Sequence, residues 1–308
     1  MKILITGAHG DIAQSIFRIL KLHYSKIIVH GMDCKNSGIG KYLFDKFIQT
    51  YKANNKKYFL HIKKITKNYD LIIPTSEAEL ICLSKNYKEL EGCPILINKP
   101  KIINLFVDKQ KTFDFLKAKK LNRPSFSVKL DVIKKYSKHF FLKTKTGSGN
   151  KNYKLINSEK KFMNLNISKK NKWIAQEFLG ADTDEFTCGL IKLGNYKNSI
   201  ILKRNLNNGL TYYAEEFRNK KLEKILYEIA DLIDLKGCIN IQLKLKNKKF
   251  IIFEINPRLS STVMMRHKIG FTDCVWWIDH FLSNKIPKLN KINSKKKKIL
   301  RVYNEVFV

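Results

Sequence analysis

The residues best suited to chemistry lie in one segment, residues 237–258, with the sequence GCINIQLKLKNKKFIIFEINPR. It contains one carboxylate, Glu254, and the side-chain amides of Gln242 and Asn256. Such oxygens suit Mg²⁺, which keeps several waters and is usually shared between one or two protein groups and the phosphates of a nucleotide. Arg258 follows closely, and its planar guanidinium could hold phosphates through paired hydrogen bonds. These residue types predict a metal and phosphate site.

Two strands joined by a short polar turn would bring these side chains together. Apolar and polar residues alternate before the turn, and β-branched or aromatic residues follow it. If the turn is residues 247–249, Gln242 lies opposite Glu254. Asn240 then lies opposite Asn256, and all four share one face because side chains alternate along a strand. Polar groups on a half-buried face need partners, which a metal ion would supply; the alternative is a polar face ending in an Asn-Pro turn.

A second candidate phosphate site is a lysine beside a glycine-rich loop. An apolar strand ends in Lys143, and the loop after it contains Gly147, Ser148 and Gly149. Glycine allows backbone N–H groups to close on an anion. The alternative is a hairpin loop that contains glycine.

These segments resemble the ATP-grasp enzymes, in particular the carbamoyl-phosphate-synthase-like branch of carboxylate–amine ligases. The most specific match is GxxNxQ from residue 237 followed by FEINPR from residue 253. In that family the residues matching Gln242, Glu254 and Asn256 hold Mg²⁺, with Mn²⁺ as an alternative, against the phosphates of ATP. The arginine matching Arg258 contacts phosphate, and Arg204, at the end of a further strand, would face the transferring phosphoryl group.

The resemblance covers nearly the whole chain in the same order and implies a set of ATP contacts. These are Lys109, Lys143, Gly147, Ser148, Gly149, Glu177, Leu179 and Glu185. Backbone groups of Glu177 and Leu179 would meet the adenine edge, and Glu185 would hold the ribose hydroxyls. Lys109 would reach the phosphates from near the start of a helix predicted over residues 104–121.

One part of the chain departs from the family pattern. The proline usual after the strand lysine is Thr144, and the later small residues of the loop are replaced by Asn150, Lys151 and Asn152. Because of this altered loop, a module that binds ATP without catalysing a reaction is an alternative function.

Alternating strands and helices near the N-terminus predict a parallel α/β sheet. Ser76 and Glu79 have the spacing of a capping box at the start of one helix. The resemblance implies an α/β (α+β) protein with a Rossmann-like pre-ATP-grasp domain over residues 1–98. A two-lobed ATP-grasp domain over residues 99–308 would follow, with a small lobe at about residues 125–180.

An alternative of another class is a Rossmann-type NAD(P)-dependent oxidoreductase or epimerase. Gly7 and Gly10 form a glycine turn after the first strand, and Asp33 ends the second strand, as in dinucleotide sites. The third small residue is Ala13 rather than glycine, which favours a close-packed turn without a dinucleotide.

Composition favours a soluble enzyme of the cytoplasm. No run approaches 18 apolar residues, the N-terminus lacks the features of a signal peptide, and six scattered cysteines form no CxxC pair. The formal net charge is +34, but 53 of the 60 basic residues are Lys, they are spread along the chain, and Arg reads bases and phosphates better. We therefore expect no nucleic acid and no membrane as partner.

The resemblance implies a two-step ligation. ATP phosphorylates a substrate carboxylate to an acylphosphate, and an amine displaces the phosphate to give an amide, ADP and phosphate. Positioning and charge neutralisation dominate phosphoryl transfer, so no protein nucleophile is needed. The partners would be small-molecule carboxylate and amine substrates that the sequence does not identify, and relatives are often homodimers.

Overall fold

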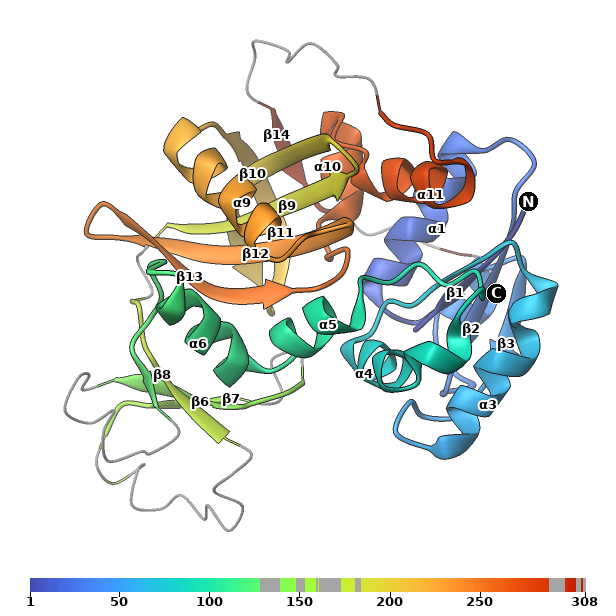
Figure 1. The fold of residues 1–308 in the computed structure, drawn as a ribbon, viewed down its shortest axis with the longest axis horizontal. Coiled ribbons are helices and arrows are strands. Elements are labelled where there is room, and N and C mark those ends of the chain that lie inside the picture. Colours follow the sequence, from blue (N-terminus) through green and yellow to red (C-terminus); the bar gives the residue numbers. More distant parts are fainter. Residues whose placement is uncertain are drawn as a thin grey trace.

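The structure is a computed structural model that describes residues 1–127, 139–147, 153–158, 160, 173–180, 184–287, 297–302 and 306. In this part the chain forms three β-sheets with helices packed on them (Figure 1). One sheet is parallel and two are antiparallel, so the predicted α/β (α+β) class is confirmed.

The N-terminal sheet is parallel and has the strand order β3-β2-β1-β4. Its strands are β1 (Lys2–Thr6), β2 (Ile28–Asp33), β3 (Lys46–Gln49) and β4 (Leu71–Ile73). The helices that follow them are α1 (Asp11–His23), α2 (Gly40–Leu43), α3 (Lys56–Ile65) and α4 (Glu77–Lys85), with 3-10 turns at Thr66–Asn68 and Tyr87–Leu90. Helix α4 begins with the predicted capping box of Ser76 and Glu79, which satisfies backbone N–H groups at its N-terminus.

The turn between β1 and α1 requires glycine at its first position. Gly7 has φ +65°, and a Cβ there would lie 2.6 Å from Oγ1 of Thr75, which donates a hydrogen bond to the carbonyl of Thr6. Gly92 has a similar φ of +77°, but a Cβ there would meet nothing within 4 Å. A side chain at Gly7 would therefore meet both backbone strain and a steric clash, whereas a side chain at Gly92 would meet backbone strain alone.

We expect Gly7→Ala to destabilise the protein by about 3 kcal/mol, because it combines a left-handed backbone with a clash against Thr75. Gly92→Ala carries only the backbone term, so we expect it to lose about 1 kcal/mol. Urea unfolding of both variants measures the difference. Equal losses would show that the turn relaxes away from Thr75.

The connection to the rest of the chain contains two helices where the sequence predicted one over residues 104–121. Helix α5 spans Pro100–Phe106 and α6 spans Lys109–Ala118. The break occurs because the side chain of Asp108 accepts hydrogen bonds from the N–H groups of Gln110 and Lys111 and so begins a new helix. The correction places Lys109 at the first position of α6.

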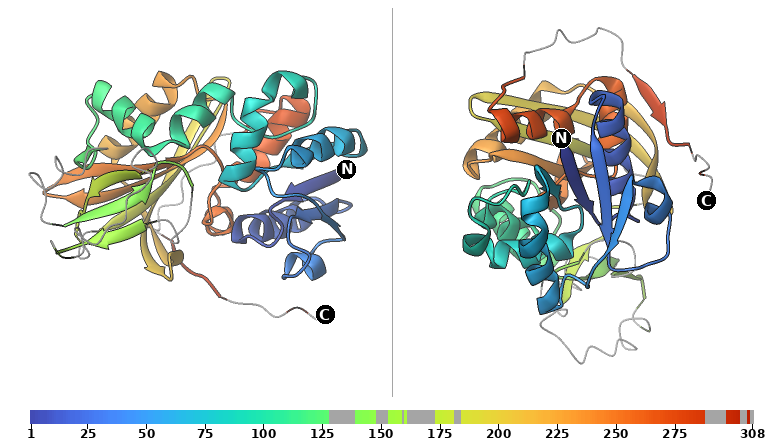
Figure 2. Two further views of the ribbon diagram at one scale, coloured as in Figure 1. Left: turned by 90° about the horizontal axis from the view of Figure 1, so that it is seen from below. Right: turned by 90° about the vertical axis from the view of Figure 1, so that its right-hand side faces the viewer.

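A small antiparallel sheet has the strand order β5-β8-β6-β7. Its strands are β5 (Phe126–Ser127), β6 (Phe140–Thr144), β7 (Tyr153–Ile156) and β8 (Trp173–Glu177). Figures 1 and 2 show this sheet well separated from the N-terminal sheet, with α5 and α6 leading from one to the other. The small sheet and the N-terminal sheet thus lie in different parts of the molecule, with α5 and α6 between them.

The large antiparallel sheet has the strand order β13-β12-β9-β10-β11-β14. Its strands are β9 (Glu185–Leu193), β10 (Tyr196–Asn207), β11 (Leu210–Phe217), β12 (Gly237–Lys246), β13 (Lys249–Asn256) and β14 (Lys298–Leu300). Its helices are α9 (Lys220–Leu232), α10 (Val263–Ile269) and α11 (Asp273–Ser283). One face packs against α5, α6 and α9 through a single buried cluster. None of the helices described here is long and apolar enough to cross a membrane.

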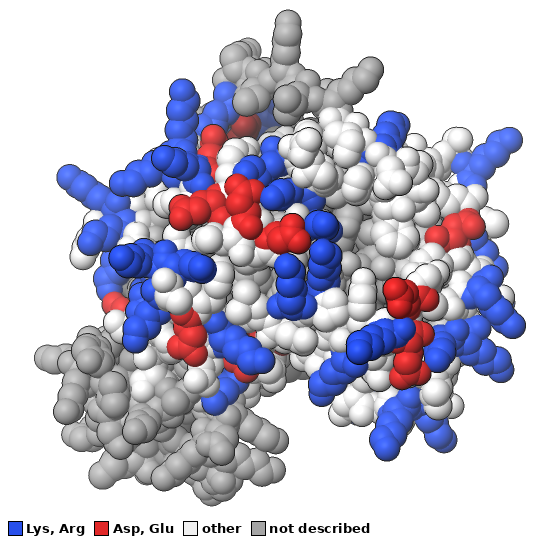
Figure 3. Space-filling model, in the orientation of Figure 1, with Lys and Arg blue, Asp and Glu red and all other residues white. Residues whose placement is uncertain are grey.

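Lys and Arg make up 60 of the 308 residues of the chain. On the face shown in Figure 3, Lys and Arg are interspersed with acidic residues and do not gather into one stripe. That face gives no support to a nucleic-acid groove, and the predicted absence of a nucleic-acid partner stays a prediction.

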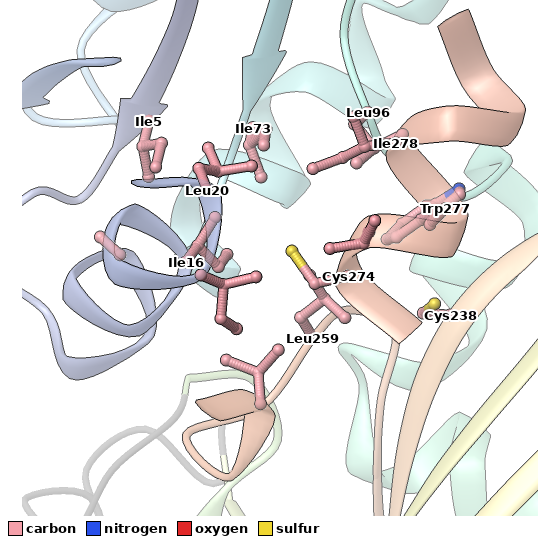
Figure 4. Packing of buried hydrophobic residues seen from close by; sticks show 14 of the residues in the cluster. Ile5, Ile16, Leu20, Ile73, Leu96, Cys238, Leu259, Cys274, Trp277 and Ile278 are labelled. Atoms are coloured by element: carbon pink, nitrogen blue, oxygen red, sulfur yellow. The ribbon is translucent and has the colours of Figure 1, made fainter. Parts of the chain in front are cut away.

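One buried cluster joins the two ends of the chain. Figure 4 shows Ile16 and Leu20 of α1 facing Leu259, Cys274 and other residues of the C-terminal region. The same cluster includes buried residues of β9, β10 and β12 on the second face of the large sheet. Apolar burial therefore fixes the N-terminal sheet against the large sheet. Side chains that the two sheets present to each other keep their relative positions.

Candidate functional site

A cleft of about 810 Å³ lies where the three sheets and α6 meet. Every predicted site residue within the described ranges lines it: Lys109, Lys143, Gly147, Glu177, Leu179, Glu185, Arg204, Gln242, Glu254, Asn256 and Arg258. Ser148 and Gly149, together with residues 150–152, lie outside the described residues. A cleft of this size is within the range of small-molecule and cofactor sites.

In the β12–β13 hairpin, Gln242 lies opposite Glu254 as predicted, but the turn that joins the strands differs from the predicted one. The turn is two residues, Asn247 and Lys248, both with positive φ, and not residues 247–249. A β-bulge then adds Phe253, because Gln242 pairs with Glu254 while Leu243 pairs with Ile252. The shorter turn and the extra residue compensate, so Gln242 and Glu254 are opposite each other as predicted.

The predicted metal ligands form a donor set of one carboxylate and two amides. Gln242 and Glu254 are paired across the hairpin, and Asn256 lies on the same face two residues further along β13. The carboxylate of Glu254 has no hydrogen-bond partner among the described residues, although it lines the cleft. A carboxylate with open oxygens beside amide oxygens fits a hard cation such as Mg²⁺. In the described part of the chain, no three His, Cys, Asp or Glu side chains are grouped so as to hold a metal.

Asn240 does not join this set, contrary to the expectation that four polar side chains would converge. It is fully buried, and its Oδ1 accepts hydrogen bonds from Thr187 at 3.0 Å and from Arg266 at 3.2 Å. The amide oxygen is therefore used inside the protein, and Asn240 does not line the cleft.

Arg204 and Glu185 form an ion pair within the cleft. Nη2 of Arg204 lies 2.6 Å from Oε1 of Glu185 and donates to Oε1 of Gln242 at 3.0 Å. Lys244, which the sequence analysis did not select, lies 3.7 Å from the other carboxylate oxygen of Glu185. The signal that could have found Lys244 is its position on β12 two residues after Gln242, on the same face. These contacts bring the predicted ribose, phosphoryl and metal residues together.

Lys143 lies on β6 in a desolvated position facing the metal residues. Its Nζ donates to Oε1 of Gln176 at 3.0 Å and lies 5.8 Å from the ring centre of Phe253, the bulged residue. Burial lowers the pKa of Lys143 to about 8, and Lys109 and Lys244 add to the effect while Glu254 and Glu185 oppose it. Gln176 and Phe253 were both missed from sequence, because a bulge and a neighbouring strand place them here.

We expect the affinity for ADP, measured without divalent metal, to fall about tenfold between pH 7 and pH 9. Lys143 carries its charge below its pKa of about 8 and loses it above, so its predicted hydrogen bonds to phosphate would weaken as pH rises. Titration with a fluorescent ADP analogue measures this, with Lys143→Met as the control that should lose the pH dependence. The same profile in both proteins would contradict the assignment.

Gly147 is held at the start of its loop by two residues of other elements. Its N–H donates to Oε1 of Glu77 at 2.6 Å, and its carbonyl accepts from Nζ of Lys109 at 2.8 Å. The N–H of Lys109 also donates to the carbonyl of Lys145. Burial raises the pKa of Glu77, which the Gly147 N–H and Lys109 oppose. Glu77 was missed, although an acidic first turn on a capped helix is a recognisable signal.

The strand β8 and the residues after it form the apolar end of the cleft. The rings of Phe141 and Phe178 are 5.3 Å apart in an edge-to-face arrangement. The carboxylate of Glu177 is bound by Lys246 at 2.8 Å and by the N–H of Ser125, which together lower its pKa against the opposing effect of burial. The N–H groups of Glu177 and Phe178 are also used internally, because they donate to the carbonyls of Ser125 and His139, so the carbonyl of Glu177 and the backbone of Leu179 are the groups that suit an adenine edge.

The dinucleotide pattern near the N-terminus has a structural use. Oδ2 of Asp33 accepts from the N–H of His9 at 3.3 Å, and Oδ1 accepts from the N–H of Lys35. Asp33 thus supports the turn from Gly7 to Gly10 and the loop after β2. These hydrogen bonds give Asp33 a structural role that needs no bound ribose. They favour the interpretation of residues 7–10 as a close-packed turn.

Comparison with known proteins places this geometry in context. A family model described as "ATP-grasp in the biosynthetic pathway with Ter operon" matches residues 169–305. No curated protein matches this chain in sequence.

Several solved structures are similar in fold. N5-carboxyaminoimidazole synthetase from Staphylococcus aureus, complexed with ADP, is 17% identical, with 90% of this chain and 76% of that chain covered and a TM-score of 0.70. N5-carboxyaminoimidazole ribonucleotide synthetase from Thermus thermophilus is 12% identical, with 97% and 82% covered and a TM-score of 0.74. Biotin carboxylase from Campylobacter jejuni, as a beta-gamma-ATP complex, is 15% identical, with 93% and 72% covered and a TM-score of 0.68. Similarity at these identities concerns the fold.

Proposed function

We propose that this chain, which has the fold of the ATP-grasp carboxylate–amine ligases, is an ATP-dependent ligase that joins a carboxylate to an amine. The observation that carries the proposal is that all the described residues matched to the family's ATP and metal contacts line one cleft, although they come from α6, the small sheet and the large sheet. The proposed domains are residues 1–98 and 99–308, with the small lobe at about residues 125–180. Cytoplasmic location and a homodimer are part of the same proposal.

The nucleotide would lie with its adenine against the ring pair of Phe141 and Phe178 and beside the backbone of Glu177 and Leu179. Glu185 would accept hydrogen bonds from the ribose hydroxyls while its carboxylate stays paired with Arg204. Lys109 and Lys143 would neutralise phosphate charge.

Gln242, Glu254 and Asn256 would hold Mg²⁺ or Mn²⁺. An ion held by these residues would supply positive charge to neutralise the phosphate charge that develops during transfer. Arg204 and Arg258 line the same cleft and would orient the γ-phosphate toward a substrate carboxylate. The acylphosphate formed would then react with the amine and release phosphate, giving an amide and ADP.

The two co-substrates would lie at the end of the cleft lined by Gly10, Asp11, Ser260 and Ser261, which we call the serine end. The residues assigned to the nucleotide and the metal would form the other end. The serine end borders Arg258, so a carboxylate there would be close to the transferring group.

The test is ADP release from Mg-ATP in the presence of pooled amino acids, other carboxylic acids and amines. A pool that raises ADP formation identifies the substrate class, and omission of single components then identifies the acid and the amine. Binding of Mg-ADP with no stimulation by any pool would favour an ATP-binding module without catalysis. Failure to bind any adenine nucleotide would contradict the proposal.

A further inference from the structure

Arg301 connects three separate segments of the chain beside the serine end of the cleft. Its Nη1 forms an ion pair with the carboxylate of Asp11. Its Nη2 donates to the carbonyl of Ser261 at 2.7 Å, and its Nε donates to the carbonyl of Thr211 at 2.8 Å. All three guanidinium nitrogens therefore have defined acceptors.

The three acceptors belong to different walls around that end. Asp11 is the first residue of α1 and follows the glycine turn, and Ser261 lies in the loop after Arg258. Both residues line the cleft. Thr211 follows Leu210, which also lines the cleft, and the Thr211 hydroxyl accepts from Nη1 of Arg204 at 3.3 Å.

Arg301 is itself held firmly. Its N–H donates to the carbonyl of Tyr212 at 2.7 Å, and the preceding strand β14 pairs with β11. Lys297, just before β14, donates from Nζ to the carbonyl of Ile269 at 2.6 Å. The Arg301 side chain is only 16% exposed, so its ion pair is less screened by water than a surface pair.

We infer that Arg301 is a positioning residue for the co-substrate end of the cleft. It sets the distance between Asp11 of the N-terminal sheet and Ser261 of the large sheet, and it does so without contacting the residues assigned to adenine, ribose or metal. A guanidinium suits this role because its donors have a fixed planar geometry and match several acceptors at once. The inference rests on the proposed function, since it assumes that the acid and the amine occupy the serine end.

A simpler role would be attachment of the C-terminal strand to the sheet. That role needs only the backbone pairing of β14 with β11 and the hydrogen bond to Tyr212. The additional contacts to Asp11 and Ser261 reach the cleft, so loss of the side chain should displace its walls. Displacements of this kind lower the efficiency of a reaction because they misplace a substrate.

The experiment compares the full-length wild type with Arg301→Gln, Arg301→Lys and the control Arg218→Gln. Arg218 pairs with Glu216 at the end of β11 and does not line the cleft. In the pooled assay, Arg301→Gln should raise the co-substrate concentration for half-maximal ADP release about tenfold or more. Affinity for a fluorescent ADP analogue should change less than about twofold, and Arg301→Lys should restore part of the loss. The inference would be overturned if Arg301→Gln weakened ADP binding as much as it raised the co-substrate concentration for half-maximal ADP release. It would also be overturned if that co-substrate concentration did not change.

A second measurement needs no co-substrate and so separates this inference from the proposed activity. Hydrogen exchange of Arg301→Gln should be at least about threefold faster in residues 8–14, 209–213 and 257–263, with residues 240–256 unchanged. Faster exchange confined to residues 297–302 would show that Arg301 only attaches its own strand. If no pool stimulates ADP release, the ligase proposal fails and exchange still decides whether Arg301 positions these walls.

Discussion

We expect Glu254→Gln to lower ADP release by about a thousandfold, because it removes the single carboxylate of the proposed metal site. Gln242 and Asn256 would remain, but neutral amides do not balance the charge of Mg²⁺ as a carboxylate does. Loss of about 4 kcal/mol of transition-state stabilisation corresponds to this factor. The measurement is ADP release with the stimulating pool as a function of Mg²⁺ concentration, and the variant should also need more Mg²⁺.

The matched control is Glu89→Gln, the same substitution at an exposed carboxylate. Glu89 pairs with Lys63 on the surface, and its side chain is 54% exposed. We expect its ADP release to equal that of the wild type within about twofold, since such pairs contribute little. A Glu254→Gln protein with normal activity and normal Mg²⁺ dependence would show that the metal lies elsewhere or that none takes part.

The largest stability effect should come from the buried ion pair of Arg266 and Asp273. Both side chains are 1% exposed, and Nη2 of Arg266 lies 2.8 Å from Oδ2 of Asp273. Arg266 also donates to Asn240, and at 2.8 Å to Ser260. We expect Arg266→Met to destabilise the protein by about 3–5 kcal/mol, because the buried carboxylate of Asp273 loses its charged partner and keeps a hydrogen bond from the N–H of Cys274. Urea unfolding measures the loss, which is a large share of typical domain stability.

The double variant Arg266→Met, Asp273→Leu tests the cause. With both charges replaced by apolar side chains, we expect more than about half of the stability to return. Arg218→Met serves as the control for loss of an exposed arginine, with an expected change below about 1 kcal/mol. If the double variant loses as much as the single one, the packing of Arg266 against Gly189, not its charge, is what matters.

The hairpin shows why a correct register did not require a correct turn. The sequence predicted the pairing of Gln242 with Glu254 by assuming a turn over residues 247–249. The structure has a two-residue turn and a bulge at Phe253. Alternation of apolar and polar residues determines which face a side chain occupies, whereas the bulge depends on cross-strand packing that no single strand specifies. The consequence is chemical, because the bulge places Phe253 beside Lys143.

The division into α5 and α6 has a similar origin. The apolar pattern of residues 104–121 fits one amphipathic helix, and Asp108 within it is compatible with an exposed side chain. In the fold, Asp108 caps a new helix and Lys109 bonds to Lys145 and Gly147 of another element. A capping residue inside a periodic pattern is ambiguous until tertiary contacts decide it.

The sequence by itself determined the fold class and identified many of the residues that line the cleft, although it missed Gln176, Lys244 and Phe253. The fold class follows from the local patterns of strands and helices, whereas most of the site residues follow from the resemblance of their motifs to the ATP-grasp family. Only the tertiary structure decided how those residues are used: Asn240 turned inward to Arg266, Glu185 paired with Arg204, and Arg301 joined to Asp11. Each of these depends on contacts between residues far apart in the chain, where burial removes water and leaves a polar group to bind whichever partner the fold provides.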